Sequence, residues 1–179
     1  MAGKSVILKW NPAISSFGML SFLHSIYKED NEGDWSIHEY EKVHAGDRFF
    51  MVKVGGGLCG IVGAGEIISD PVQDRDWSGR GRRVFYSDLR YELRVSPDTL
   101  PILESGVLED NIPGFDWRGG HSGAVLEGQQ ARVLEQLYEN YLLANAALFA
   151  DRLQLIKRRG LPNDQLYIDG GLLAKIQEI

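Results

Sequence analysis

The sequence of 179 residues has one cysteine and four histidines. Because Cys59 stands alone, the chain can form neither an internal disulfide bond nor a CxxC zinc or redox site. Such cysteine usage is typical of the reducing cytoplasm. The histidines lack metal-ligand spacings such as HExxH, and no carboxylate cluster stands beside a histidine pair. We therefore expect no metal and no cofactor.

The sequence also lacks long hydrophobic runs and an excess of positive charge. The apolar run at the N-terminus stops at Asn11 and Pro12, which is too short for the hydrophobic region of a signal peptide. No other stretch approaches the length of a membrane span. We expect a soluble, cytoplasmic protein with no membrane partner. The net charge of −6 argues against a large surface that follows nucleic-acid phosphates, but not against a small basic patch.

One short segment, 74–83, is strongly basic. It holds one tryptophan among four arginines: Arg75, Trp77, Arg80, Arg82 and Arg83. Arginine side chains bind phosphate groups with paired hydrogen bonds. A phosphate-binding loop and an ordinary solvated loop both fit this composition.

The remaining composition is that of a globular protein, with 44% hydrophobic and 25% charged residues. A chain of this length can bury one core without disulfides or metals. Short apolar or alternating runs predict strands, and the segment 55–57 predicts a hairpin turn between two of them. The expected strands are 5–10, 47–54, 59–68 and 83–95, with a brief one after residue 160. Segment 35–43 is ambiguous between a strand and a short helix.

Two segments have the pattern of helices. Asn11 is a good N-cap and Pro12 suits the first helical position, so a helix is expected from there to about Tyr27. From about Gln129 to Arg159 apolar residues recur at helical spacing without Pro or Gly, which predicts an unusually long helix. A last helical turn is expected near the C-terminus. Hairpin-linked strands with helices indicate an α+β fold with a mixed or antiparallel sheet.

Two motifs resemble catalytic or nucleotide-binding signatures without fitting them. GHSGA around Ser122 is close to a nucleophile elbow, but His121 is the last histidine, so the order nucleophile, acid, histidine is impossible. Gly55, Gly57 and Gly60 form G-x-G-x-x-G, which in a dinucleotide site must open a helix. Here an apolar strand pattern follows. We therefore expect no catalytic residues and a hairpin turn at these glycines.

A longer pattern is more specific. GDRFFMVKVGGGLCGIVGAGEIISDP, residues 46–71, resembles the middle of EVE domains of the PUA-like superfamily. The matching features are a Gly-Asp, an apolar strand, a turn, a G-I-V-G followed by a strand ending near Glu66, and then Pro71. Three further segments are similar to parts of the same family: ILKWNP, WSIHEY and VFYSDLRYEL. A fourth, FDWRGGHSGAVL, is similar to a segment of EVE-like domains attached to HNH-type nucleases. The resemblance covers about 5–137, although His38-Glu39-Tyr40 replaces the usual Arg-Asn-Tyr.

This resemblance implies an EVE/PUA-like domain over 1–140: a curved mixed sheet that closes toward a barrel, with flanking helices. Residues 141–179 are expected to be a C-terminal helical extension packed on that domain or on a partner. The implied function is non-catalytic recognition of a modified base, such as methylated cytosine, in DNA, RNA or a nucleotide. A flipped base needs an aromatic stacking surface and a few hydrogen bonds to its edge.

The expected ligand-binding residues follow from this resemblance and from the residue types. They are Trp10, Asn11, Trp35, Ser36, His38, Tyr40, Trp117, His121 and Ser122. Phosphates beside the pocket would be bound by Arg80, Arg82 and Arg83. The tryptophans and Tyr40 are equally typical of a core, and GFDWRGGHSG, 114–123, equally fits an ordinary turn before the long helix.

Two other functions remain open. The long helix has extra apolar residues, including Leu143, Ala146 and Ala147, and two apolar faces would suit an effector protein or a homodimer. An enzyme that acts on nucleotides or nucleic acid would need a histidine or carboxylate cluster, for which the sequence gives no convincing candidate.

Overall fold

The computed structural model describes residues 3–161 and 163–178. In these residues nine strands form one mixed sheet. The strands are β1 (Lys4–Trp10), β2 (Glu32–Ser36), β3 (Arg48–Lys53), β4 (Gly60–Ile67), β5 (Val72–Asp74), β6 (Val84–Val95), β7 (Leu103–Glu104), β8 (Ala124–Glu127) and β9 (Leu166–Ile168). The helices are α1 (Met19–Tyr27), the 3-10 turn η1 (Tyr40–Lys42), α2 (Ser105–Asn111), α3 (Gly128–Arg159) and α4 (Gly170–Gln177).

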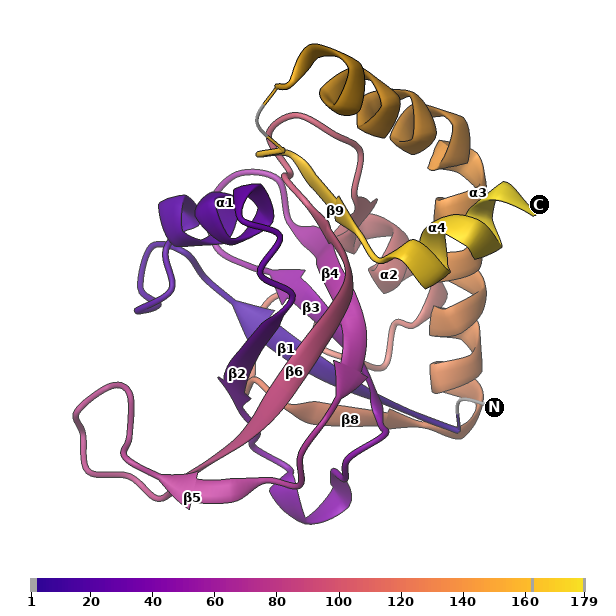
Figure 1. Cartoon of the computed structure of the whole chain (residues 1–179). Helices are drawn as coiled ribbons and strands as arrows, with labels where there is room; N and C mark the ends of the chain where they lie inside the picture. Colours follow the sequence, from indigo (N-terminus) through magenta and orange to yellow (C-terminus); the bar gives the residue numbers. More distant parts are fainter. Residues whose placement is uncertain (1–2, 162, 179) are drawn as a thin grey trace.

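The sheet is curved and its two edges approach each other. Its main strand order is β2-β6-β4-β3-β1-β8, with β1 and β3 parallel and the other pairs antiparallel. Just beyond the edge strands, His38 N–H donates to Ser122 O and Glu39 N–H donates to Gly123 O, both at 3.0 Å. These bonds join the end of β2 to the start of β8, so the sheet closes toward a barrel (Figure 1).

The expected hairpin is formed by β3 and β4, and its second strand is rich in glycine for a steric reason. A Cβ atom on Gly65 would lie 2.0 Å from the carbonyl oxygen of Arg90 on β6. Only glycine permits this close approach of two strands. Lys53 satisfies the turn by donating to the carbonyl oxygens of Gly56 and Leu58.

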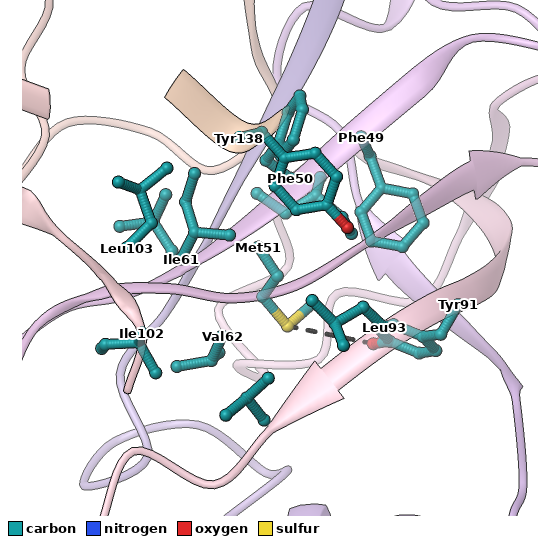
Figure 2. Close-up of a cluster of buried hydrophobic side chains, with 14 of the residues drawn as sticks. Phe49, Phe50, Met51, Ile61, Val62, Tyr91, Leu93, Ile102, Leu103 and Tyr138 are labelled. Atoms are coloured by element: carbon teal, nitrogen blue, oxygen red, sulfur yellow. Dashed lines mark hydrogen bonds between the residues drawn. The ribbon is translucent and has the colours of Figure 1, made fainter. Parts of the chain in front are cut away.

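The core lies between the sheet and α3. Figure 2 shows the side chains of β3, β4 and β6 meeting those of the 102–103 segment and of α3. Phe50 packs edge-on against Tyr138 of α3, with ring centroids 5.2 Å apart. Each fully buried aromatic or aliphatic side chain stabilises the fold by about 1.5–3 kcal/mol, which makes this contact a main attachment of α3 to the sheet.

The helix expected from Pro12 begins later, at Met19. Residues 11–18 instead form a turn in which Ile14 N–H and Ser15 N–H donate to the carbonyl of Asn11. The Asn11 side chain caps that turn by accepting from Ala13 N–H. The local hydrogen bonds therefore agree with an N-cap, but the chain leaves the helical path before α1.

The remaining elements agree with the sequence pattern in part. The expected strands and the long helix to Arg159 are present, as are the brief strand β9 and the last helix α4. The pattern missed β5, β7, β8 and α2, and of the ambiguous segment 35–43 only Trp35 and Ser36 belong to a strand, while Tyr40–Lys42 form η1. In these short elements neighbouring strands and helices decide the conformation, and periodicity has too few residues to act on.

The C-terminal segment contributes to the same sheet. Residue 140 lies inside the continuous helix α3, and β9 pairs with β6. Leu172 and Ile176 of α4 are buried in the main core, while Leu143 and Leu148 of α3 are exposed. No helix in the described parts of the chain is both long and apolar enough to cross a membrane.

Candidate functional site

A pocket of about 510 Å³ opens beside the end of β1. Its walls come from the 11–17 turn, from β2 and β6, and from the loops before β6 and β8. Five aromatic residues line it: Phe17, Trp35, Trp77, Tyr86 and Tyr91. Polar lining residues include Lys9, Asn11, Ser36, Arg94 and Ser122. This combination of apolar walls and few polar groups is typical of a small-ligand site.

Trp35 of β2 is held in one orientation at this pocket. Its indole Nε1–H donates to Ser122 Oγ at 3.0 Å. Ser122 Oγ also accepts from the backbone N–H of Lys9 at 2.8 Å. Phe17 packs edge-on against the indole, with centroids 6.2 Å apart. A ring fixed from two sides offers a stacking surface at low entropic cost.

The glycine-rich segment 114–123 positions Ser122. Gly123 has φ of +88°, and a Cβ atom there would lie 2.6 Å from His38 N and from Ile37 Cα. Its N–H donates to the carbonyl of Ile7 on β1 at 2.8 Å. Gly123 thus allows the segment to pass closely between β1 and the end of β2.

Trp77, which was not among the expected ligand-binding residues, stands at the pocket mouth with 47% of its surface exposed. Its backbone N–H donates to the hydroxyl of Tyr86, and that hydroxyl donates to the carbonyl of Arg75. The 75–83 loop that carries Trp77 projects from the body of the molecule (Figure 1). The sequence signal for Trp77 was a tryptophan surrounded by arginines. The sequence could not show that this residue lies beside the pocket.

The three arginines expected to bind phosphate differ in their surroundings. Arg82 forms an ion pair with Asp76 of the same loop. Its Nε donates to Asp76 Oδ2 at 3.0 Å and its Nη2 donates to Oδ1 at 3.2 Å. The hydrogen bond from Arg82 holds the pKa of Asp76 well below its usual range. Arg82 is therefore already paired within its own loop, and its contact with phosphate stays a prediction. Arg80 and Arg83 are exposed, and Arg83 also lies over the ring of Phe85.

Two of the expected tryptophans belong to the core. Trp10 has no exposed surface, and its Nε1–H donates to Phe17 O. Trp117 is 1% exposed, and its Nε1–H donates to Ile112 O at 3.1 Å. Neither lines the pocket, so their assignment to ligand binding is corrected. The glycine-rich segment contributes to the pocket through Gly120 and Ser122 instead of Trp117.

The other expected residues divide between the pocket and its surroundings. Asn11, Trp35, Ser36 and Ser122 line the pocket. His38 and His121 are exposed and stack on each other with centroids 3.9 Å apart. Tyr40 stacks on Phe85 at 3.7 Å. The last three residues are not in the pocket lining.

The floor of the pocket holds a buried arginine that the sequence did not suggest. Arg94 is 1% exposed, lies 4.7 Å from the ring of Tyr91, and donates to Ser25 Oγ and Asp30 O. Burial lowers the pKa of Arg94 and raises that of Tyr91 to about 12. Strand β6 has a bulge at Glu92, which has no partner on β4. Because the bulge breaks the alternation of side chains along the strand, Tyr91 and Arg94 both reach the pocket.

The pocket shows no arrangement of an activated nucleophile. Ser122 Oγ accepts from two N–H groups, and the ring of the adjacent His121 stacks on His38. A serine nucleophile requires a base that accepts its proton. Within residues 3–161 and 163–178 no three His, Cys, Asp or Glu side chains gather as a set of metal ligands.

Comparison with known proteins supports the fold. No protein-family model and no curated protein matches the chain. A solved structure from Pseudomonas syringae is 14% identical, with a TM-score of 0.51, over 74% of this chain and 99% of that one. A Leishmania major protein is 12% identical, with a TM-score of 0.50, over 76% and 96%. Human THYN1, solved in complex with 5-methylcytosine-containing DNA, is 12% identical, with a TM-score of 0.50, over 75% and 96%.

The THYN1 structure is an EVE/PUA-like domain, and the present chain matches 96% of it. The present chain therefore has the EVE/PUA-like fold. The α+β architecture with a curved mixed sheet and a long helix near the C-terminus, expected from the sequence, is confirmed.

Proposed function

We propose that the chain recognises a modified base in nucleic acid, or the corresponding nucleotide, and catalyses no reaction. One observation carries this proposal: Trp35 is fixed by Ser122 and Phe17 in the wall of a 510 Å³ pocket, with Trp77 at the mouth. A flipped base stacks on such rings, and stacking contributes about 1–3 kcal/mol per base. Methylated cytosine is the proposed base, since THYN1, which has the same fold, was solved with 5-methylcytosine-containing DNA.

The apolar lining supports selection for methylation. Phe17, Tyr86 and the indole of Trp35 would surround a methyl group with hydrocarbon. Burial of one methyl is worth about 1 kcal/mol, roughly a fivefold preference in Kd. A modest preference of this size over the unmodified base is therefore expected.

The proposed phosphate contacts come from the 75–83 loop. Arg80 and Arg83 are exposed on the same loop as Trp77. A nucleic-acid strand whose base enters the pocket would pass close to both side chains. Each contact to a duplex adds about 0.9 to the slope of log Kd against log salt, so Arg80→Ala should reduce that slope by about this amount.

Tryptophan fluorescence tests the function directly. Oligonucleotides with 5-methylcytosine are titrated in parallel with unmodified ones, as DNA and as RNA, at low salt. Since Trp35 and Trp77 line the pocket whereas Trp10 and Trp117 are buried, binding should change the emission of the first two. A saturable response, stronger for the methylated strand, supports the proposal. No response to any strand at high concentration contradicts it.

A further inference from the structure

The hydroxyl of Ser122 can act toward a ligand in only one way. A serine hydroxyl has one hydrogen to donate and two lone pairs that accept. Both lone pairs are occupied, by the backbone N–H of Lys9 at 2.8 Å and by Trp35 Nε1–H at 3.0 Å. These two groups can only donate, so the direction of the bonds is fixed. Ser122 lines the pocket, and what it offers there is its O–H.

The two cationic residues in the lining, like Ser122, offer hydrogen-bond donors to the pocket. The Lys9 ammonium donates to Asp116 O and has further hydrogens to donate. Arg94 is a donor with no acceptor, and its buried Nε has no hydrogen-bond partner in the described structure. Three separate elements, β1, β6 and the loop before β8, thus present donors to one pocket.

Residues that carry acceptors line the pocket on a different segment. Asp30, Glu32 and Asp34 belong to its lining and are exposed. A ligand that satisfies both kinds of group carries an acceptor edge toward Ser122 and amino or imino hydrogens toward segment 30–34.

Building on the base-binding function proposed above, we infer that the pocket selects bases with a ring carbonyl over adenine-type bases, and that the Ser122 O–H reads the carbonyl oxygen. Cytosine, uracil and guanine each carry a ring carbonyl and, on the same edge of the base, an N–H or NH₂ donor. A carbonyl oxygen has two lone pairs and forms strong bonds to charged donors. Adenine has no carbonyl, and each of its ring nitrogens accepts through a single in-plane lone pair, so it satisfies fewer of the donors in this pocket than a carbonyl oxygen does.

The test compares the two classes of base on the intact chain. Kd is measured by fluorescence for the 5′-monophosphates of 5-methylcytidine, cytidine and guanosine, and for those of adenosine and N6-methyladenosine. Carbonyl bases are expected to bind about tenfold more tightly, the effect of one hydrogen bond from a hydroxyl that would otherwise be left without an acceptor. Ser122→Ala removes the donor and should bring this ratio close to one, whereas Ser122→Thr keeps the hydroxyl and should preserve it.

The ratio separates a reading role from a structural one. If Ser122 only supported Trp35, Ser122→Ala would weaken both classes equally and leave the ratio unchanged, which would overturn the inference. Equal binding of both classes by the unchanged protein would overturn it as well, while the proposed function stands. Failure of every nucleotide and oligonucleotide to bind overturns the proposed function and this inference together.

Discussion

Trp35 and Ser122 are 87 residues apart in sequence and joined by a hydrogen bond of 3.0 Å. The bond connects β2 to the segment before β8, where the two edges of the curved sheet meet. It therefore belongs both to the closure of the sheet and to the wall of the pocket. Changes at this junction should affect binding and stability in different proportions.

Replacement of Trp35 should separate binding from folding when it is compared with Trp117. Trp35→Ala removes the proposed stacking surface, and we expect a loss of about 1–3 kcal/mol in binding, roughly a 5- to 150-fold rise in Kd. Trp117→Phe removes the buried bond to Ile112 O and should lower the free energy of unfolding by about 1 kcal/mol without changing Kd. Labelled oligonucleotides and thermal melts measure the two effects. An unchanged Kd for Trp35→Ala together with a raised Kd for Trp117→Phe would place the ligand away from Trp35.

Trp77 should contribute to binding and hardly to stability. It is half exposed at the pocket mouth, so Trp77→Ala should change the free energy of unfolding by less than about 0.5 kcal/mol. A stacking contact to the ligand would nevertheless raise Kd severalfold. Leu20→Ala is the matched control, because Leu20 is exposed on α1 outside the pocket lining. An unchanged Kd for Trp77→Ala would exclude contact with the ligand.

Gly123 should tolerate no side chain. Gly123→Ala places a Cβ atom 2.6 Å from His38 N in a left-handed conformation, and we expect a loss of more than about 2 kcal/mol in the free energy of unfolding. Gly128 has φ of +58° with open space around it, so Gly128→Ala should cost only about 1 kcal/mol. Denaturant titrations of both variants measure the difference. Equal losses would show that the close approach at Gly123 is relaxed in solution.

The Asp76–Arg82 pair should make the stability of the 75–83 loop depend on acid. Hydrogen bonds from Arg82 and Ser78 lower the pKa of Asp76 below its ordinary value of 3.8. The ionised carboxylate therefore stabilises the fold above that pH, and this contribution is lost as the pH falls below it. The difference in melting temperature between the protein and Asp76→Asn should be constant from pH 7 to pH 5 and shrink below pH 3.8. Arg80→Ala, in the same loop, should show no such dependence.

The function of α3 in partner binding stays a prediction. Leu143 and Leu148 are exposed on its second half, which agrees with the apolar surplus seen in the sequence. Light scattering would distinguish a homodimer from a monomer.

The sequence by itself determined most of the regular structure. Strands such as 47–54 and 83–95 and the helix ending at Arg159 were predictable, because long periodic segments carry their own signal. The Gly-Asp to Pro71 pattern also indicated the EVE/PUA-like fold, which the structural comparisons confirm. Asn11, Trp35, Ser36 and Ser122 were expected at a pocket, and the fold brings them to one.

The tertiary structure alone decided which aromatic and charged residues face that pocket. Trp10 and Trp117 have the same side chain as Trp35, and their environments differ because the curved sheet and α3 bury residues on both sides. Arg82 could not be distinguished from Arg80 until Asp76 was seen to pair with it. Arg94 reaches the floor through a bulge that breaks the two-residue alternation of β6, and simple alternation could not place it.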